Sequence, residues 1–267
     1  MNMDDGGQSP INYAYSPNND VNYFLNMVYK MFTQHYKVRY PAGKSLPIYV
    51  FNHFSGYENA SATSKSELKE MGILGPQQIK MGNGDDEFAP LTDAGTCAHE
   101  FAHLVTGNYS NLIYEGESGG INESFSDMTE FAFKYYLSQK YPWYWDQVDW
   151  TIGADTNIYG VAIRYMDNPS FDGDSIEHID DYYEDMGVHN ASGILNKAFY
   201  LLSNKSRWNV DLAYKVMLYA NLNFWTDGSN FEDATCGAIA AAEELRLNHF
   251  DVVSVFKEVG LSCRELA

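Results

Sequence analysis

The chain has 267 residues, 45% of them hydrophobic and 20% charged, and this length can bury one large core or two moderate ones. The formal net charge of −19 argues against nucleic acid or an anionic membrane surface as a partner, because a field of that sign repels phosphate. No apolar run approaches the roughly 20 residues that span a bilayer, and the N-terminus "MNMDDGGQSP" lacks the basic and apolar regions of a signal peptide. We therefore expect no membrane insertion, and any export signal lies outside this sequence.

The first third of the chain mixes helix and strand. Apolar residues recur at helical spacing from Asn18 to about Tyr36, and Asn18, Asn19 or Asp20 can cap this helix. The segment "LPIYVFNHF" alternates as a strand does, and "QQIKMGNGDDEFAPL" contains a second short strand followed by a turn. These segments predict a small sheet beside an amphipathic helix.

After Thr92 and Asp93, either of which can cap a helix, every strongly periodic segment is helical. The predicted helices span residues 95–106, 120–140, 192–204, 209–225, 230–247 and 250–259. We find no internal repeat, and the loop "GNYSNLIYEGESGG" is the expected boundary between the mixed part and the helical part.

The stretch "CAHEFAHLVTG" places two histidines and a glutamate inside one predicted helix. His99 and His103 are four residues apart, so both point the same way and can bind one metal ion. Glu100 projects roughly 100° around the helix from His99, where it can reach a water on that ion without binding the ion itself. This arrangement is typical of zinc hydrolases, and two core histidines bonded to the backbone are the alternative.

A catalytic zinc needs three protein ligands and an open position for water. The segment "GGINESFSDMTEF" offers Glu123 on the next predicted helix, and Asp127 lies one turn further along the same face. The spacing suits Glu123 as a ligand and Asp127 as the carboxylate that orients a histidine through its other ring nitrogen. Without the histidine motif, a solvated helical carboxylate would be the better interpretation of Glu123.

Four segments together, "HEFAH", "LIYEGESGGINESFSD", "IRYMDNPS" and "MGVHNASGILNKAFYLL", resemble the thermolysin-like family of zinc endopeptidases, and particularly its pseudolysin branch. The resemblance runs from about Tyr15 to Cys263. It implies an α+β fold of two lobes with the zinc site in the cleft between them. Residues 1–114 would form a shortened, sheet-containing lobe that ends with the zinc-binding helix. Residues 115–267 would form a mainly α-helical lobe carrying the third ligand and a catalytic histidine.

The resemblance assigns roles to the residues that match the family's motifs. One catalytic zinc ion would be bound by His99, His103 and Glu123. Glu100 would take a proton from the attacking water and later deliver it to the leaving amine. The donors to the developing oxyanion would be Tyr114 and His189. The substrate-binding residues would be Arg164, which binds a carbonyl beyond the cut, and the aligning pair Asn59 and Ala60.

The function implied is a zinc-dependent endopeptidase that cuts protein or peptide substrates on the amino side of bulky apolar residues. The pocket for that apolar side chain would be lined by Phe88, Leu91, Thr96 and Ile163. One alternative is a binding protein that retains zinc but is proteolytically inactive, and another is a zinc hydrolase acting on a non-peptide bond.

Two departures from the family pattern qualify this assignment. Glu184 stands where the family has the aspartate that holds the catalytic histidine, and either Glu184 or the adjacent Asp185 could orient His189. Acidic calcium ligands of the family are replaced here by Gly95, Phe131 and Lys134. A cation site without its carboxylates loses most of its attraction for a hard ion, so calcium near the active site is doubtful.

The same resemblance pairs Cys236 with Cys263 in a C-terminal disulfide, with two reduced thiols as the alternative. A bridge would imply an oxidising compartment, so the enzyme is expected to be secreted or extracellular. We also expect it to be a monomer. Cys97 lies two residues before His99, which turns it away from the metal, and it is expected to be a small buried apolar residue.

Overall fold

The structure, a computed structural model, describes residues 16–44, 47–54, 58–141 and 149–264. The chain divides into two compact units, of which the first comprises residues 1–108, 129–149 and 153–162. The second comprises residues 109–128, 150–152 and 163–267, so helix α4, Gly116–Lys140, contributes residues to both. Within the described ranges, no helix is both long and apolar enough to cross a membrane.

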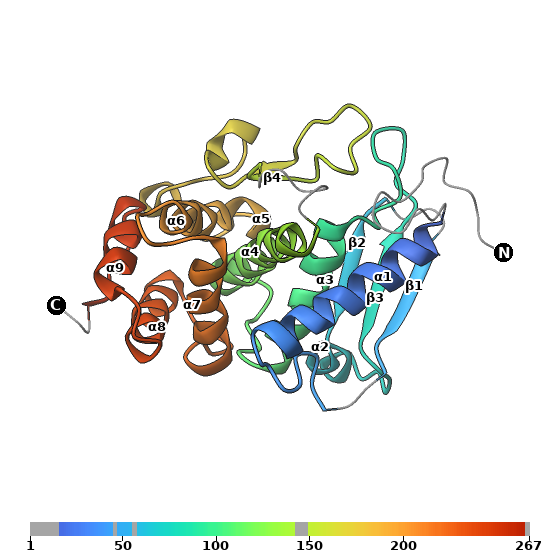
Figure 1. Cartoon of the computed structure of the whole chain (residues 1–267), viewed down its shortest axis with the longest axis horizontal. Coiled ribbons are helices and arrows are strands. Elements are labelled where there is room, and N and C mark those ends of the chain that lie inside the picture. The colour runs from blue at the N-terminus through green and yellow to red at the C-terminus, as the bar shows by residue number, and fades with distance from the viewer. Residues whose placement is uncertain (1–15, 45–46, 55–57, 142–148, 265–267) are drawn as a thin grey trace. The chain divides into compact units, whose positions relative to one another are not determined.

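The first unit contains a three-stranded sheet in the order β1-β3-β2 (Figure 1). β1, Tyr49–Phe54, runs parallel to β3, Gln78–Gly82, whereas β2, Ala60–Thr63, runs antiparallel to β3. The central strand β3 carries the fully buried Ile79 and Met81. The strands predicted in "LPIYVFNHF" and "QQIKMG" are thus confirmed as β1 and β3, while β2 was not predicted.

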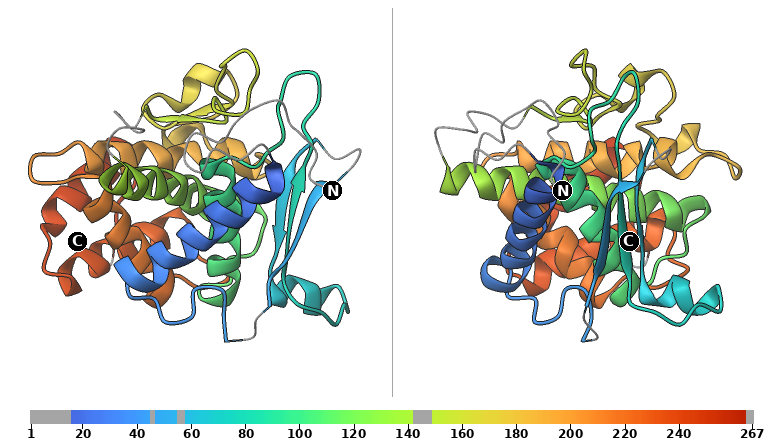
Figure 2. Two further views of the ribbon diagram at one scale, coloured as in Figure 1. Left: turned by 45° about the vertical axis from the view of Figure 1, so that its right-hand side comes forward. Right: turned by 90° about the vertical axis from the view of Figure 1, so that its right-hand side faces the viewer.

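Two long helices of the first unit, α1 and α3, lie on the same side of this sheet (Figure 2). α1, Pro17–Lys30, continues as a π-helical turn, Met31–His35, and α3 spans Ala94–Asn108. The rings of Phe32 and Phe101 stack with their centroids 5.6 Å apart. A short helix, α2, Lys65–Glu70, begins with a capping box formed by Ser64 and Glu67. The aromatic packing occupies one side of α3, so polar side chains can occupy its other side.

The second unit is mainly helical beyond the first half of α4. Its helices are α5, Val188–Ala191, α6, Gly193–Ser203, α7, Val210–Asn223, α8, Phe231–Glu244, and α9, His249–Glu258. Short elements precede them, namely strands β4, Thr151–Ile152, and β5, Arg164–Tyr165, and the 3-10 turns Pro169–Asp172 and Ile179–Asp181. The helices predicted between residues 192 and 259 are all present.

The C-terminal helices of the second unit are held by close packing and a covalent bridge. Cys236 on α8 forms a disulfide with Cys263, which confirms the predicted pair. Gly237 lies so near the indole of Trp225 that a Cβ on it would come within 2.8 Å of the ring, and only glycine fits there without a shift. Trp225 Nε1 donates a hydrogen bond to the Ala234 carbonyl at 3.1 Å. Together these contacts fix α8 against the end of α7 and the C-terminal segment.

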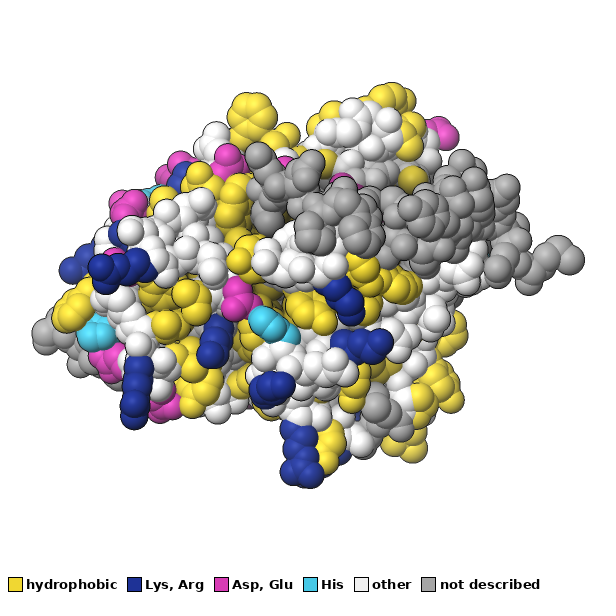
Figure 3. All heavy atoms as spheres, in the orientation of Figure 1, with side chains coloured by type: hydrophobic (Ala, Val, Ile, Leu, Met, Phe, Trp, Pro, Cys, Tyr) yellow, Lys and Arg dark blue, Asp and Glu magenta, His cyan; other side chains and the backbone are white. Residues whose placement is uncertain are grey.

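Charged side chains are scattered over the face drawn in Figure 3, where lysines, arginines and acidic residues alternate with apolar and neutral surface. The described part of this face carries no continuous basic stripe.

Candidate metal centre

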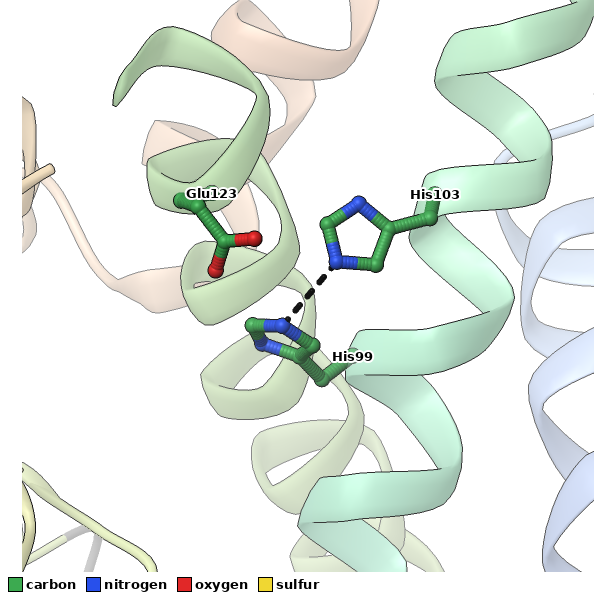
Figure 4. Close-up of side chains that lie close together, drawn as sticks. All are labelled: His99, His103 and Glu123. Atoms are coloured by element: carbon green, nitrogen blue, oxygen red, sulfur yellow. Dashed lines mark hydrogen bonds between the residues drawn. The ribbon is translucent and has the colours of Figure 1, made fainter. Parts of the chain in front are cut away.

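Helix α3 carries the two histidines of the candidate site. The helix begins where Asp93 accepts hydrogen bonds from the Thr96 backbone N–H at 3.0 Å and from the Thr96 hydroxyl at 2.5 Å, so Asp93 is the N-cap. One turn apart, His99 and His103 are half-buried, and their Nε2 atoms lie 3.1 Å from each other (Figure 4). The two rings therefore converge on one point, as expected for residues spaced by four on a helix.

Glu123 on α4 completes a group of three metal-binding side chains. The ligand atoms of His99, His103 and Glu123 all lie within 4.8 Å of one another, and Figure 4 shows the carboxylate facing the two rings. Two nitrogens that bind one tetrahedral zinc at about 2.05 Å lie roughly 3.3 Å apart, which is close to the distance between the two imidazoles. Two imidazoles and one carboxylate are also the donor set of many catalytic zinc sites, so the residues fit this ion.

Glu123 is fully buried and has two polar neighbours from the second unit. The Tyr114 hydroxyl donates a hydrogen bond to Glu123 Oε1, and His189 Nε2 lies 3.2 Å from Glu123 Oε2. The structure thus brings the predicted oxyanion donors Tyr114 and His189 to the same carboxylate, although they are 75 residues apart in the sequence. The two side chains are about half exposed, so their polar ends are accessible to a substrate.

Close approach between α4 and α5 positions His189. A Cβ on Gly119 would meet the Val188 side chain at 2.4 Å, and one on Gly120 would meet the Ala191 Cβ at 3.0 Å. The glycine pair of "ESGGINES" therefore allows α5 to lie directly on α4, one turn before Glu123. This explains locally why glycines precede the third predicted ligand.

Asp127, one turn beyond Glu123, is fully buried and binds the predicted substrate residue Arg164 with two hydrogen bonds. Arg164 Nη2 donates to Asp127 Oδ1 at 2.7 Å, and Arg164 Nε donates to Asp127 Oδ2 at 3.1 Å. Asn196 Nδ2 also donates to Asp127 Oδ2, at 2.8 Å. The sequence did not single out Asn196, although one amide within the apolar run "GILNKAFYLL" was a visible signal. The predicted contact of Asp127 with a histidine stays a prediction.

Glu100 and the carboxylates before α5 lie in different environments. The predicted base Glu100 is 5% exposed and follows His99 on α3.

Glu184 and Asp185 are both exposed, in the segment that leads to α5. Burial first, and then the charges of Glu117, Glu184 and Asp185, raise the pKa of Tyr182. An orienting contact between either of these two carboxylates and His189 stays a prediction.

The predicted substrate residues of the first unit lie on and beside the sheet. Asn59 Oδ1 accepts a hydrogen bond from the Ala60 backbone N–H at 2.9 Å, and Ala60 opens the edge strand β2. Leu91 is buried, and Phe88 forms an isolated β-bridge with Asn157. The Thr96 hydroxyl donates its hydrogen bond to Asp93. Ile163, in the second unit, is 44% exposed. The apolar pocket assigned to these residues stays a prediction.

Lys134 occupies the interior of the acidic cluster in which calcium was judged doubtful. Its Nζ lies 2.9 Å from Glu130 Oε1 and 2.8 Å from Asp155 Oδ2, and the lysine and glutamate are both buried. Burial lowers the pKa of Lys134, but the charges of Glu130 and Asp155 outweigh this effect and raise it above its ordinary value. A Cβ on Gly95 would meet Glu130 Oε1 at 2.3 Å, so no longer side chain fits there without a shift. The cluster therefore already contains a cation.

Cys97 is fully buried, and its Sγ lies 3.7 Å from the Thr92 carbonyl oxygen. Burial first, helped by Asp93, raises the pKa of this thiol well above its ordinary value. Both observations agree with the predicted role of Cys97 as a small buried residue.

Comparison with known proteins accounts for most of the chain. Residues 8–107 match the family model of the thermolysin metallopeptidase catalytic domain, and residues 110–261 match that of the thermolysin metallopeptidase alpha-helical domain. A solved structure, the precursor of protealysin, a metalloproteinase from Serratia proteamaculans, superposes with a TM-score of 0.76 at 24% identity. The match covers 96% of this chain and 81% of that one, and it supports the two-lobe α+β fold.

Curated relatives of the chain are described as proteases. The chain is 38% identical over 252 residues to the hemagglutinin/proteinase of Vibrio cholerae serotype O1, covering 94% of this chain and 38% of that protein. It is 37% identical over 252 residues to the neutral protease of Vibrio proteolyticus, with the same coverage. It is 44% identical over 153 residues to a zinc metalloprotease of Helicobacter pylori, covering 57% of each chain.

The chain spans a little over a third of the length of the Vibrio relatives that it matches. These matches do not distinguish the branches of the family, so the assignment to the pseudolysin branch stays a prediction. Two family models in sequence, covering nearly all of the residues from 8 to 261, leave no doubt about the wider group. The chain belongs to the thermolysin metallopeptidase family.

Proposed function

We propose that this chain is a zinc-dependent endopeptidase that hydrolyses peptide bonds with His99, His103 and Glu123 as the metal ligands. The observation that carries the proposal is the convergence of these three side chains within 4.8 Å, with Tyr114 and His189 at the same carboxylate. When bound, zinc supplies Lewis acidity, which polarises the scissile carbonyl and lowers the pKa of water.

Glu100 acts as the general base in this proposal. It follows His99 on α3, and its buried carboxylate accepts the proton of the attacking water and passes it to the leaving amine. Burial favours this role because a carboxylate shielded from bulk water exchanges its proton with the reacting groups rather than with solvent.

Tyr114 and His189 donate hydrogen bonds to the oxygen of the scissile carbonyl as it gains negative charge. Their polar ends already lie at Glu123, so a carbonyl beside that carboxylate is within their reach. Arg164 binds a second substrate carbonyl on the far side of the cut. The two hydrogen bonds from Arg164 to Asp127 fix the plane of its guanidinium group. Asn59 and Ala60 align the substrate along the edge strand β2.

We also propose the class of substrate, the compartment of the enzyme and the boundaries of its two lobes. The substrates are proteins or peptides with a bulky apolar residue just after the cut, held by Phe88, Leu91, Thr96 and Ile163. The Cys236–Cys263 disulfide supports a secreted or extracellular enzyme, because such bridges persist in oxidising surroundings. We propose in addition that the enzyme is a monomer. The lobes are residues 1–114 and 115–267, and Glu184 or Asp185 orients His189.

The experiment incubates the purified chain with a denatured protein, with and without a zinc chelator, and maps the cut sites by mass spectrometry. We expect chelator-sensitive cleavage that returns on adding zinc, and none from the Glu100→Gln variant. Tight zinc binding without any cleavage by the parent chain would instead establish the alternative, an inactive binding protein of the same fold.

A further inference from the structure

We infer that Asn196, a buried amide on α6, is a positioning residue that holds Arg164 and the His189 segment in register with Glu123. The inference rests on the proposed function, because it concerns residues that we place in the same reaction. Asn196 is 1% exposed and does not itself reach the metal-binding side chains, so it acts through its neighbours.

The side chain of Asn196 makes three hydrogen bonds, two to residues of α4 and one to Ser192, which follows α5. Its Nδ2 donates to Asp127 Oδ2 at 2.8 Å, and Asp127 in turn binds Arg164 on β5. Its Oδ1 accepts a hydrogen bond from the Ser124 hydroxyl at 2.6 Å, and Ser124 is the residue after Glu123 on α4. One amide therefore connects the neighbours of the third metal ligand with the predicted substrate arginine.

The third hydrogen bond leads toward α5. Asn196 Nδ2 lies 3.5 Å from Ser192 Oγ, and the Ser192 hydroxyl donates to the His189 carbonyl oxygen at 2.7 Å. Ser192 and Ser124 are both fully buried, as is Asp127, so water does not compete for these bonds. Because the amide has a donor end and an acceptor end, its orientation is fixed by having Asp127 on one side and Ser124 on the other.

Loss of this amide would affect catalysis more than folding. Asp127 keeps its two bonds to Arg164 when the third donor is removed, so its charge stays paired, but Oδ2 is no longer held from the α6 side. The carboxylate and the guanidinium can then shift together. A misplacement of about 1 Å at a catalytic group lowers the rate on the order of 100-fold.

The test compares Asn196→Leu with Asn221→Leu. Asn221 is a matched control, because it is a fully buried amide on α7 whose Oδ1 accepts a hydrogen bond from Ser110 and which lies outside the proposed site. Asn196→Ala, which removes both ends of the amide without adding bulk or charge, serves as a second variant should the leucine variant not fold. Zinc content, resistance to denaturant, kcat/KM and hydrogen–deuterium exchange are measured for each.

We expect all variants to fold and to retain zinc, while kcat/KM falls about 100-fold for Asn196→Leu and less than threefold for Asn221→Leu. Exchange should accelerate only in the Asn196 variants, at the amides of Ile163 and Met166, which flank β5 and bond to Ile152 and Trp150, and at the amides of Ala191 and Ser192 at the end of α5. Combining Asn196→Leu with Arg164→Ala should cost little more than Arg164→Ala alone, since one acts through the other.

The inference is overturned if the Asn196 variants lose no more kcat/KM than the control, if β5 and α5 exchange as in the parent chain, or if the losses from Asn196→Leu and Arg164→Ala multiply. Failure of the proposed function looks different: the parent chain itself would cleave no peptide. The exchange measurements would still decide whether Asn196 positions these segments.

Discussion

Replacing Lys134 by methionine should be among the most destabilising single changes in the first unit. The substitution keeps most of the aliphatic stem and removes the ammonium that contacts Glu130 and Asp155 at 2.9 and 2.8 Å. Glu130 would remain 3% exposed, with its main source of positive charge gone. A buried carboxylate that loses its ammonium partner pays more of its desolvation cost.

The size of the effect follows from the burial of each partner. Removing one partner of a buried ion pair costs about 3 to 5 kcal/mol. The pair of Lys134 and Glu130 falls in this range, because their side chains are only 6% and 4% exposed. The Asp155 side chain is 44% exposed, so solvent screens it and it adds at most about 1 kcal/mol. We therefore expect a loss of about 4 kcal/mol, which lowers the melting temperature by roughly 8 to 16 °C at this chain length.

Denaturant unfolding and thermal melting of the zinc-loaded protein measure this loss. Lys140→Met is the matched control, because Lys140 is exposed at the end of the same helix, and its loss should stay within about 0.5 kcal/mol. Glu130→Gln added to Lys134→Met should restore part of the stability, since it removes the buried negative charge that has lost its ammonium partner. A Lys134→Met variant as stable as the Lys140→Met control would refute the reasoning.

Further predictions concern the site, the bridge and the substrate. Glu100→Gln should retain zinc by metal analysis while peptide hydrolysis falls by several powers of ten, and near-parental activity would reject Glu100 as the base. Thiol titration of the denatured, unreduced chain should find one cysteine, Cys97, and removing the Cys236–Cys263 bridge across 27 residues should cost about 3 to 4 kcal/mol by denaturant unfolding. Cut sites should favour leucine or phenylalanine over glycine or aspartate after the scissile bond, at about 0.8 kcal/mol per buried methylene. Arg164→Ala should lower kcat/KM for all such substrates alike, and a selective loss would count against its carbonyl contact.

The features that the sequence predicted well depend only on the geometry of a single helix. Residues 95–106 were predicted as helical and Asp93 as a possible cap, and α3 follows both expectations. The convergence of His99 and His103 needs only a spacing of four on that helix. In contrast, β2 was missed because "ASAT" is short and its partner β3 lies further along the chain. The start of α4 was placed at residue 120 because the glycines of "GESGG" weaken the helical signal.

The contacts that complete the site depend on partners remote in sequence. Asn196 reaches Asp127 and Ser124 across 69 and 72 residues, and no local pattern connects them. The sequence showed that Lys134 replaces an acidic residue of the family, which argues against calcium. Only the structure shows that its ammonium pairs with Asp155 as well as with Glu130 on its own helix.

Helix α4 explains why these distant partners are needed. Glu123, Asp127, Glu130 and Lys134 follow one another at spacings of four, three and four, so they form a single stripe along the buried middle of α4. Buried charges must be compensated one by one, and the members of the stripe have different partners: Tyr114 and His189 for Glu123, Arg164 and Asn196 for Asp127, Lys134 for Glu130, and Asp155 as well as Glu130 for Lys134. Because the partners differ, the two ends should respond differently to mutation. Lys134→Met should lower stability and leave kcat/KM of the folded fraction unchanged, whereas Asn196→Leu should lower kcat/KM with a smaller loss of stability. A parallel loss of both properties in both variants would mean that the stripe acts as one unit, contrary to this account.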